Sequence, residues 1–179
     1  EGANRIAFRT RTSGVMYRLV LRYWRRGADV APMGSGIKVV RNFYLLGEKG
    51  EVVRQLKSGD AVPRGSYLLS EVAATNTLGT NMSYLLVEDF KPSCGEYVPP
   101  DDPRFRNLQN CTAYVLREER TAHLAYHHEQ TPAAVNDRCV ILAELAGRYL
   151  VPPARVEMMY QTDMRGHSGS FVLNVVDPK

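Results

Sequence analysis

The most informative segment for the fold lies near the C-terminus and is Val151-Pro-Pro-Ala-Arg-Val-Glu-Met-Met-Tyr160. Pro152 and Pro153 hold the chain extended, because proline fits neither a helix interior nor a central strand. The stretch ends in Met159 and Tyr160, directly before Gln161-Thr162-Asp163 and Arg165-Gly166, which predict a turn. These two large side chains therefore either fill the core of the chain itself or are offered to another surface.

Short segments rich in β-branched and aromatic residues lie on both sides of this stretch, separated by Gly, Pro and Asp turn signals. The clearest is Met16–Arg26, in which Tyr17, Leu19, Leu21 and Tyr23 share one face and arginines alternate with them. The predicted strands are residues 5–11, 16–26, 37–46, 52–56, 66–73, 84–90, 112–117, 121–127, 139–146 and 170–176.

No long amphipathic helix interrupts these strands, so the sequence predicts an all-β fold, an antiparallel β-sandwich with long loops. Residues 37–46 with 52–56, and residues 112–117 with 121–127, are expected to form hairpins. The longest loop is expected at residues 91–110, which contain four prolines. The 179 residues have no repeat and no second composition regime, so a single domain spanning 1–179 is expected.

The formal net charge is +4, and eighteen arginines stand against five lysines. Seven of the arginines fall within the first 26 residues. Such a cluster favours binding to a nucleic acid or another anionic surface. The simpler interpretation, which we prefer, is that these arginines occupy the solvent faces of strands, because no nucleic-acid-binding motif accompanies them.

Gly166-His-Ser-Gly-Ser170 is the segment most similar to a serine-nucleophile motif. The nucleophile elbow needs a glycine two residues after the serine and a helix beyond it, whereas here Ser170 and a predicted strand follow. His123 and His127 have the spacing of a zinc-protease motif, but Leu124 stands where that motif needs glutamate. The sequence therefore predicts that the chain is not an enzyme and holds no metal and no cofactor.

The three cysteines cannot all pair within the chain, because their number is odd. Cys94 and Cys111 flank the proline-rich loop and are the candidates for a disulfide in an oxidising compartment. Cys139 opens an apolar segment and is expected to be a buried thiol that packs as a small hydrophobic residue.

The segment Val151–Tyr160, followed by Arg165-Gly166 and Ser168, resembles the last segment of bacterial alpha-2-macroglobulin-like proteins. In that family a Pro-Ala-Arg-x-Glu-x-Met-Tyr pattern precedes an acidic turn and an Arg-Gly pair. Looser agreement extends over almost the whole chain, as at Leu116–Arg120. The chain is similar to the terminal macroglobulin-type domain, the bacterial counterpart of the receptor-binding domain of the vertebrate proteins.

This resemblance implies a β-sandwich at the C-terminal end of a much larger chain that traps proteases and is secreted, periplasmic or attached to the cell envelope. In bacterial relatives a Met-Tyr pair of this domain lies against a thioester in another domain and keeps nucleophiles away. By this match Met159 and Tyr160 are the shielding pair. The residues expected to support their loop are Pro152, Pro153, Arg155, Glu157, Arg165 and Gly166.

The resemblance also implies the partners, which are the other domains of the parent chain, above all a thioester domain, and target proteases through the parent. Neither nucleic-acid binding nor direct membrane insertion is expected. Two alternatives remain. A generic extracellular β-sandwich binding or adhesion module would present Trp24 or exposed tyrosines and bury Met159 and Tyr160. A nucleic-acid-binding domain would use the N-terminal arginines and bind in a strongly salt-dependent manner.

Overall fold

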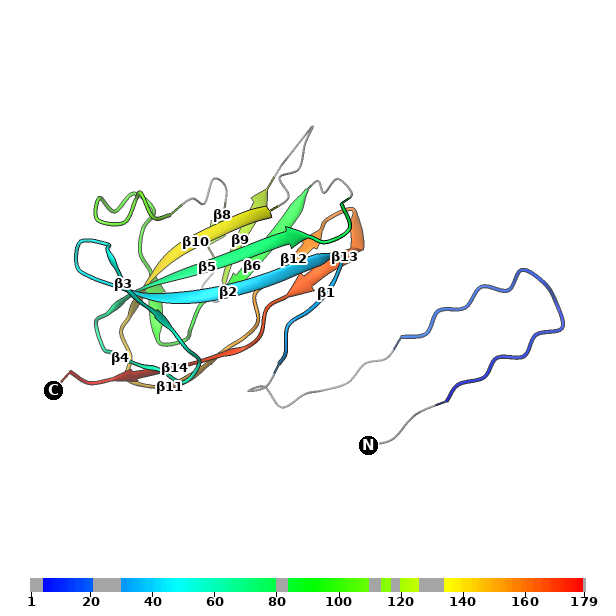
Figure 1. The fold of residues 1–179 in the computed structure, drawn as a ribbon, viewed down its shortest axis with the longest axis horizontal. Coiled ribbons are helices and arrows are strands. Elements are labelled where there is room, and N and C mark those ends of the chain that lie inside the picture. The colour runs from blue at the N-terminus through cyan, green and yellow to red at the C-terminus, as the bar shows by residue number, and fades with distance from the viewer. Residues whose placement is uncertain are drawn as a thin grey trace.

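Fourteen strands and no helix make up the described part of the chain in a computed structural model (Figure 1). The structure describes residues 5–20, 30–79, 84–109, 114–116, 120–125 and 134–178. Within these ranges no helix is long and apolar enough to cross a membrane. In chain order the strands are β1 (Met33–Ser35), β2 (Ile37–Leu46), β3 (Val52–Leu56), β4 (Ala61–Pro63), β5 (Tyr67–Asn76), β6 (Leu85–Phe90), β7 (Gly95–Tyr97), β8 (Tyr114–Leu116), β9 (Arg120–Ala125), β10 (Ala134–Ala143), β11 (Gly147–Val151), β12 (Arg155–Met158), β13 (Gln161–His167) and β14 (Phe171–Val176).

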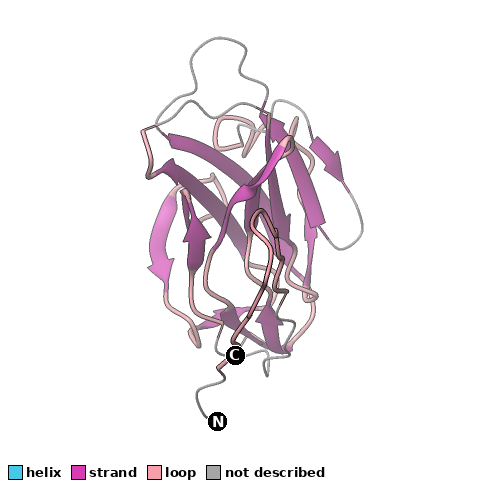
Figure 2. Cartoon of the chain, turned by 90° about the vertical axis from the view of Figure 1, so that its right-hand side faces the viewer, coloured by secondary structure: helices cyan, strands magenta, loops and turns pink. Residues whose placement is uncertain are grey.

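The strands form three sheets, which build the body of the molecule without any helical layer (Figure 2). One sheet has the order β1-β13-β12-β6-β9-β8, the second β3-β2-β5-β10-β7, and the third β11-β14-β4. All pairings are antiparallel except that of β14 with β4. The prediction of an all-β, antiparallel β-sandwich is therefore confirmed.

The five-stranded sheet packs against both other sheets with one face, and a loop covers part of its other face. Alternation along β2 and β5 turns Ile37, Val39, Val72 and Ala74 toward the six-stranded sheet, where they meet Val156 and its neighbours on β6 and β12. Further along the same face, Phe43, Leu68 and Ile141 pack against Val62, Leu173 and Val175 of the three-stranded sheet. Part of the opposite face is covered by the loop that follows β7, through Val98 and Phe105.

A polar group separates the two apolar clusters on this inner face. Arg41 lies between Val39 and Phe43 on the inward side of β2, and its Nη1 lies 3.1 Å from Oδ1 of Asp89 on β6. Ser70 of β5 donates a hydrogen bond of 2.6 Å to the other oxygen of Asp89. Burial raises the pKa of the Asp89 carboxyl, whereas Arg41 and Ser70 act in the opposite direction. A charged pair thus ties two sheets together inside the sandwich.

Both predicted N-terminal strands are corrected by the structure where it describes them. Residues 5–20 contain no strand, are exposed throughout, and form an arm that extends away from the body (Figure 1). Phe8 and Tyr17 stack across the arm with ring centroids 4.5 Å apart. Residues 21–26 of the predicted strand lie outside the described residues. No described strand pairs with residues 16–20, and an alternating pattern without a hydrogen-bonded neighbour does not form a stable strand.

The turn predicted at residues 161–166 is also wrong, because these residues belong to β13. The chain reverses two residues earlier, at Met159 and Tyr160, which connect β12 and β13. The strand predicted at 139–146 begins earlier, as β10, and the predicted loop 91–110 contains β7. The two predicted hairpins form, as β2 with β3 and β8 with β9.

Candidate functional site

The β12–β13 hairpin carries the conspicuous apolar pair of the sequence at its tip. Met158 pairs with Gln161, so Met159 and Tyr160 are the two residues of the turn. Along β12, Val156 and Met158 point inward and are 1% and 4% exposed. Met159 and Tyr160 are 40% and 77% exposed. The second methionine and the tyrosine therefore lie at the surface, whereas the first methionine fills the core.

Tyr84, the residue directly before β6, contacts both residues of this tip. The Met159 amide donates a hydrogen bond of 3.0 Å to the carbonyl oxygen of Tyr84, which continues the β6–β12 ladder by one step. The Tyr84 ring meets the Tyr160 ring edge to face, with centroids 5.1 Å apart and planes at 86°. Sequence reasoning missed Tyr84, which was predicted only as the first residue of a strand.

The approach to the hairpin is fixed at Ala154, which follows the two prolines. Ala154 and Ser168 exchange two hydrogen bonds, from the Ser168 amide to the Ala154 carbonyl at 2.9 Å and from the Ala154 amide to Ser168 Oγ at 3.0 Å. Ala154 is fully buried, Pro152 is exposed and Pro153 is half-buried. The extended proline segment thus joins the hairpin through a locked, buried residue.

The other predicted supporting residues lie on the two strands of the hairpin. Glu157 stands opposite Arg165 in the β12–β13 register, and Arg155 stands opposite His167. The Arg155 guanidinium lies over the Phe90 ring at 5.6 Å from its centroid. A side chain on Gly166 would clash with the Ile37 carbonyl oxygen, so only glycine allows β13 to pass this close to β2. The structure therefore brings all six predicted supporting residues to one hairpin and its approach.

The segment similar to a serine-nucleophile motif has a structural role. Ser168 is buried, and its Oγ accepts from the Ala154 amide and donates to the Gly169 carbonyl. Ser170 Oγ accepts from the Val30 amide at 3.1 Å. Among the described residues no group of three or more His, Cys, Asp and Glu side chains is placed to hold a metal ion. His123 lies on β9, and His127 lies outside the described residues.

Cys94 is a buried thiol without a disulfide partner among the described residues. Burial raises its pKa to about 11. Cys111 lies outside the described residues, so the Cys94–Cys111 disulfide stays a prediction. Cys139 is 3% exposed, as its predicted role in the core requires.

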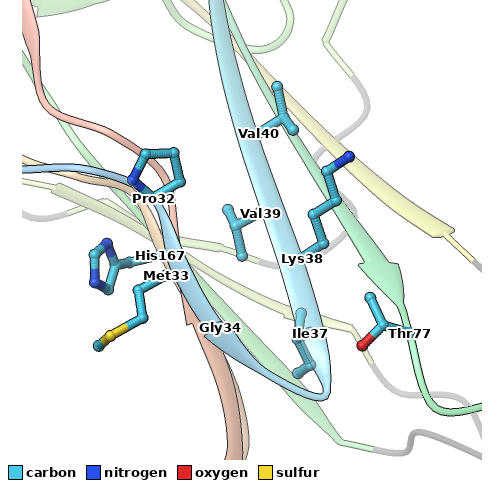
Figure 3. Close-up of a pocket in the computed structure, with 9 residues that line it drawn as sticks. All are labelled: Pro32, Met33, Gly34, Ile37, Lys38, Val39, Val40, Thr77 and His167. Atoms are coloured by element: carbon cyan, nitrogen blue, oxygen red, sulfur yellow. The ribbon is translucent and has the colours of Figure 1, made fainter.

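A shallow apolar pocket of about 230 Å³ lies between the ends of β1 and β2, at the far end of β13 from the hairpin tip (Figure 3). Met33 and Val40 are exposed beside it, and His167 closes one side. Its lining residues are Pro32, Met33, Gly34, Ile37, Lys38, Val39, Val40, Thr77 and His167. This lining does not suggest a cofactor.

The sequence profile described as the bacterial alpha-2-macroglobulin MG10 domain matches residues 36–163, which include the hairpin tip. A search of the curated proteins found no match. Among solved structures, a mutant of Salmonella alpha-2-macroglobulin is similar with a TM-score of 0.60 at 19% identity, over 80% of this chain and 9% of that one.

Two Escherichia coli structures are similar in the same way. Native alpha-2-macroglobulin from domain MG7 to the C-terminus gives a TM-score of 0.59 at 22% identity, over 82% of this chain and 24% of that one. The trypsin-activated protein gives a TM-score of 0.62 at 20% identity, over 83% of this chain and 11% of that one. At these identities the likeness shows the fold, and the chain spans only a small part of the length of each relative.

Proposed function

Because the chain belongs to the family of bacterial alpha-2-macroglobulin MG10 domains, we propose that it serves as a non-catalytic terminal domain of a larger protease-trapping protein. Its partners would then be other domains of the same parent, and target proteases would be met only through that parent. One structural relative is described as trypsin activated, which is the behaviour expected of a protease trap. A secreted, periplasmic or envelope-attached location follows from this proposal.

The Met159–Tyr160 turn would cover a thioester held by another domain of the parent. The observation that carries this proposal is the exposure of the pair, 40% and 77%, on a hairpin whose neighbouring residue Met158 is buried. A thioether adapts to irregular apolar surfaces, and a tyrosine covers a large area while keeping one polar end. Both properties suit a lid over a reactive bond that water must not reach.

Cleavage of the parent by a protease would move the tip away from the thioester. The two arrangements, covered and uncovered, would form a two-state element biased by cleavage. The chain itself supplies no reacting group in this mechanism. It supplies an apolar cover whose removal makes the thioester accessible to nucleophiles.

The exposed fractions favour this proposal over a generic binding module, which requires Met159 and Tyr160 to be buried. The nucleic-acid alternative depends on the arm, where Arg5, Arg9, Arg11 and Arg18 are exposed. It predicts binding of a duplex oligonucleotide at low salt that weakens steeply as salt is added. We expect no such binding in a fluorescence-anisotropy titration.

The proposed function is tested in the parent protein by Tyr160→Gly. We expect the thioester of the uncleaved variant to react with methylamine faster than that of the wild type. Leu145→Gly is a matched control, because Leu145 is an exposed apolar residue (59%) in another connection between strands. Equal rates for the wild type, the control and Tyr160→Gly would refute the proposal.

A further inference from the structure

We infer that Tyr84 is a positioning residue that sets the orientation of the Met159–Tyr160 turn. This inference rests on the proposed shielding function and assigns a third residue to it. Tyr84 contacts both turn residues, one through its backbone and the other through its side chain. Its carbonyl oxygen accepts the Met159 amide at 3.0 Å, and its ring meets the Tyr160 ring at a centroid distance of 5.1 Å.

The backbone of Tyr84 has a left-handed conformation that is rare for a tyrosine. Among the described residues Tyr84 is the one non-glycine residue with a positive φ, 55°. Aromatic residues rarely adopt this left-handed conformation, which glycine and asparagine tolerate best. Rare conformations of this kind persist where the surrounding structure imposes them, and they concentrate at functional sites.

The start of β6 at Leu85 does not by itself require a tyrosine at the position before it. Glycine or asparagine would make the same bend with less strain, and either would keep the carbonyl that accepts the Met159 amide. What a tyrosine adds is the ring, and the ring is the part that contacts Tyr160. The choice of a strained aromatic residue is therefore explained by the contact with the turn.

The edge-to-face arrangement restricts Tyr160 more than burial does. Tyr160 is 77% exposed, so contacts with the core do not hold its ring. The contact with Tyr84, at 86° between the ring planes, is the aromatic contact that the structure shows for it. We infer that Tyr84 keeps the Tyr160 ring in one orientation before any partner is met, which lowers the entropy lost when the turn docks.

The test compares two substitutions at Tyr84. Tyr84→Asn removes the ring and tolerates the positive φ, so the 179-residue chain should unfold at the same temperature or higher. Tyr84→Phe keeps the ring and is the matched control. In the 179-residue chain, NMR relaxation should show lower order parameters for the Tyr160 ring in Tyr84→Asn, and wild-type values in Tyr84→Phe. Unchanged order parameters in Tyr84→Asn would overturn the inference.

The parent protein then separates this inference from the proposed function. We expect Tyr84→Asn to speed the reaction of the thioester with methylamine about two- to tenfold, the range that corresponds to loss of one aromatic pair. Tyr84→Phe should react at the wild-type rate. If Tyr160→Gly accelerates the reaction and Tyr84→Asn does not, the positioning role is wrong and the shielding role stands. If neither accelerates it, the shielding role is wrong.

Discussion

Arg41 and Asp89 form an ion pair across two sheets, with Nη1 3.1 Å from Oδ1 and side chains that are 1% and 3% exposed. Arg41 also lies over the Phe43 ring, at 5.0 Å from its centroid. Removing two charges from water is costly, and the mutual attraction of the pair offsets this cost only while both partners are present. The pair therefore contributes more to where the sheets dock than to the net free energy of unfolding.

Asp89→Asn should lower the free energy of unfolding by about 3–5 kcal/mol, because the buried Arg41 guanidinium loses the carboxylate that lies 3.1 Å from it. Urea unfolding at neutral pH, followed by circular dichroism, measures the loss. Asp177→Asn is the control: its partner Arg64 is exposed, and its loss should not exceed about 1 kcal/mol. Equal losses in the two variants would show that water reaches the buried pair.

In the 179-residue chain, Met158→Ala should lower the free energy of unfolding much more than Tyr160→Ala does. Met158 is 4% exposed, so its truncation should cost about 2–5 kcal/mol. Tyr160 is 77% exposed, and its truncation should change stability by no more than about 1 kcal/mol. Chemical denaturation of both variants checks this. A large loss at Tyr160 would mean that the tip is part of the structural core.

The Cys94 thiol should resist alkylation in the folded chain. Burial raises its pKa to about 11, so little thiolate forms near pH 8, and the sulfur is not reached by solvent. Iodoacetamide labelling followed by peptide mass mapping should find Cys94 unmodified before unfolding and modified in denaturant. Labelling in denaturant that required a reductant would instead show that Cys94 is in a disulfide, and the linked peptide isolated without reductant would identify whether Cys111 is its partner.

The ionised Asp60 carboxylate should stabilise the folded chain near neutral pH, and this stabilisation should be lost in acid. Hydrogen bonds from the Lys57 amide and the Arg54 guanidinium hold its pKa below the ordinary value of 3.8. The folded state therefore favours the ionised carboxylate, so this stabilisation is fully present above that value and is lost as the pH falls through the lowered pKa. Thermal unfolding of Asp60→Asn should differ from wild type near neutral pH and converge with it in acid. A constant difference at all pH values would contradict this assignment.

The sequence was informative wherever alternation and pairing agreed. Ile37–Leu46 was predicted as a strand, and it is β2, since Ile37, Val39 and Phe43 alternate onto one buried face and pair with β5. Within that strand, however, Arg41 occupies an inward position, and no local signal identified its partner 48 residues away. Long-range pairs of this kind follow from the docking of sheets, which a local pattern does not contain.

The candidate site was predicted only in part, because its geometry also depends on contacts between residues that are far apart in the sequence. The exposed pair Met159–Tyr160 was singled out, but the turn was expected after it, because polar residues 161–166 resemble a loop. They form β13 since Gly166 lets the backbone pass close to Ile37, a contact that is visible only in the folded structure. Residues 16–20 are the opposite case, in which alternation predicts a strand but no strand in the described part of the chain pairs with them.

The two-residue connection between β12 and β13 has a mechanical consequence. Met159 and Tyr160 continue directly from strands that are hydrogen-bonded on both sides, to each other and, through β12, to β6. The register shifts beside this connection, because Glu157 pairs with Arg165 while Met158 pairs with Gln161, so residues 162–164 of β13 have no partner on β12. Met159 is fixed on the other side, where its amide bonds to the Tyr84 carbonyl. Met159 therefore moves only with the six-stranded sheet, whereas the extra residues of β13 leave Tyr160 room to adjust to the surface that it covers.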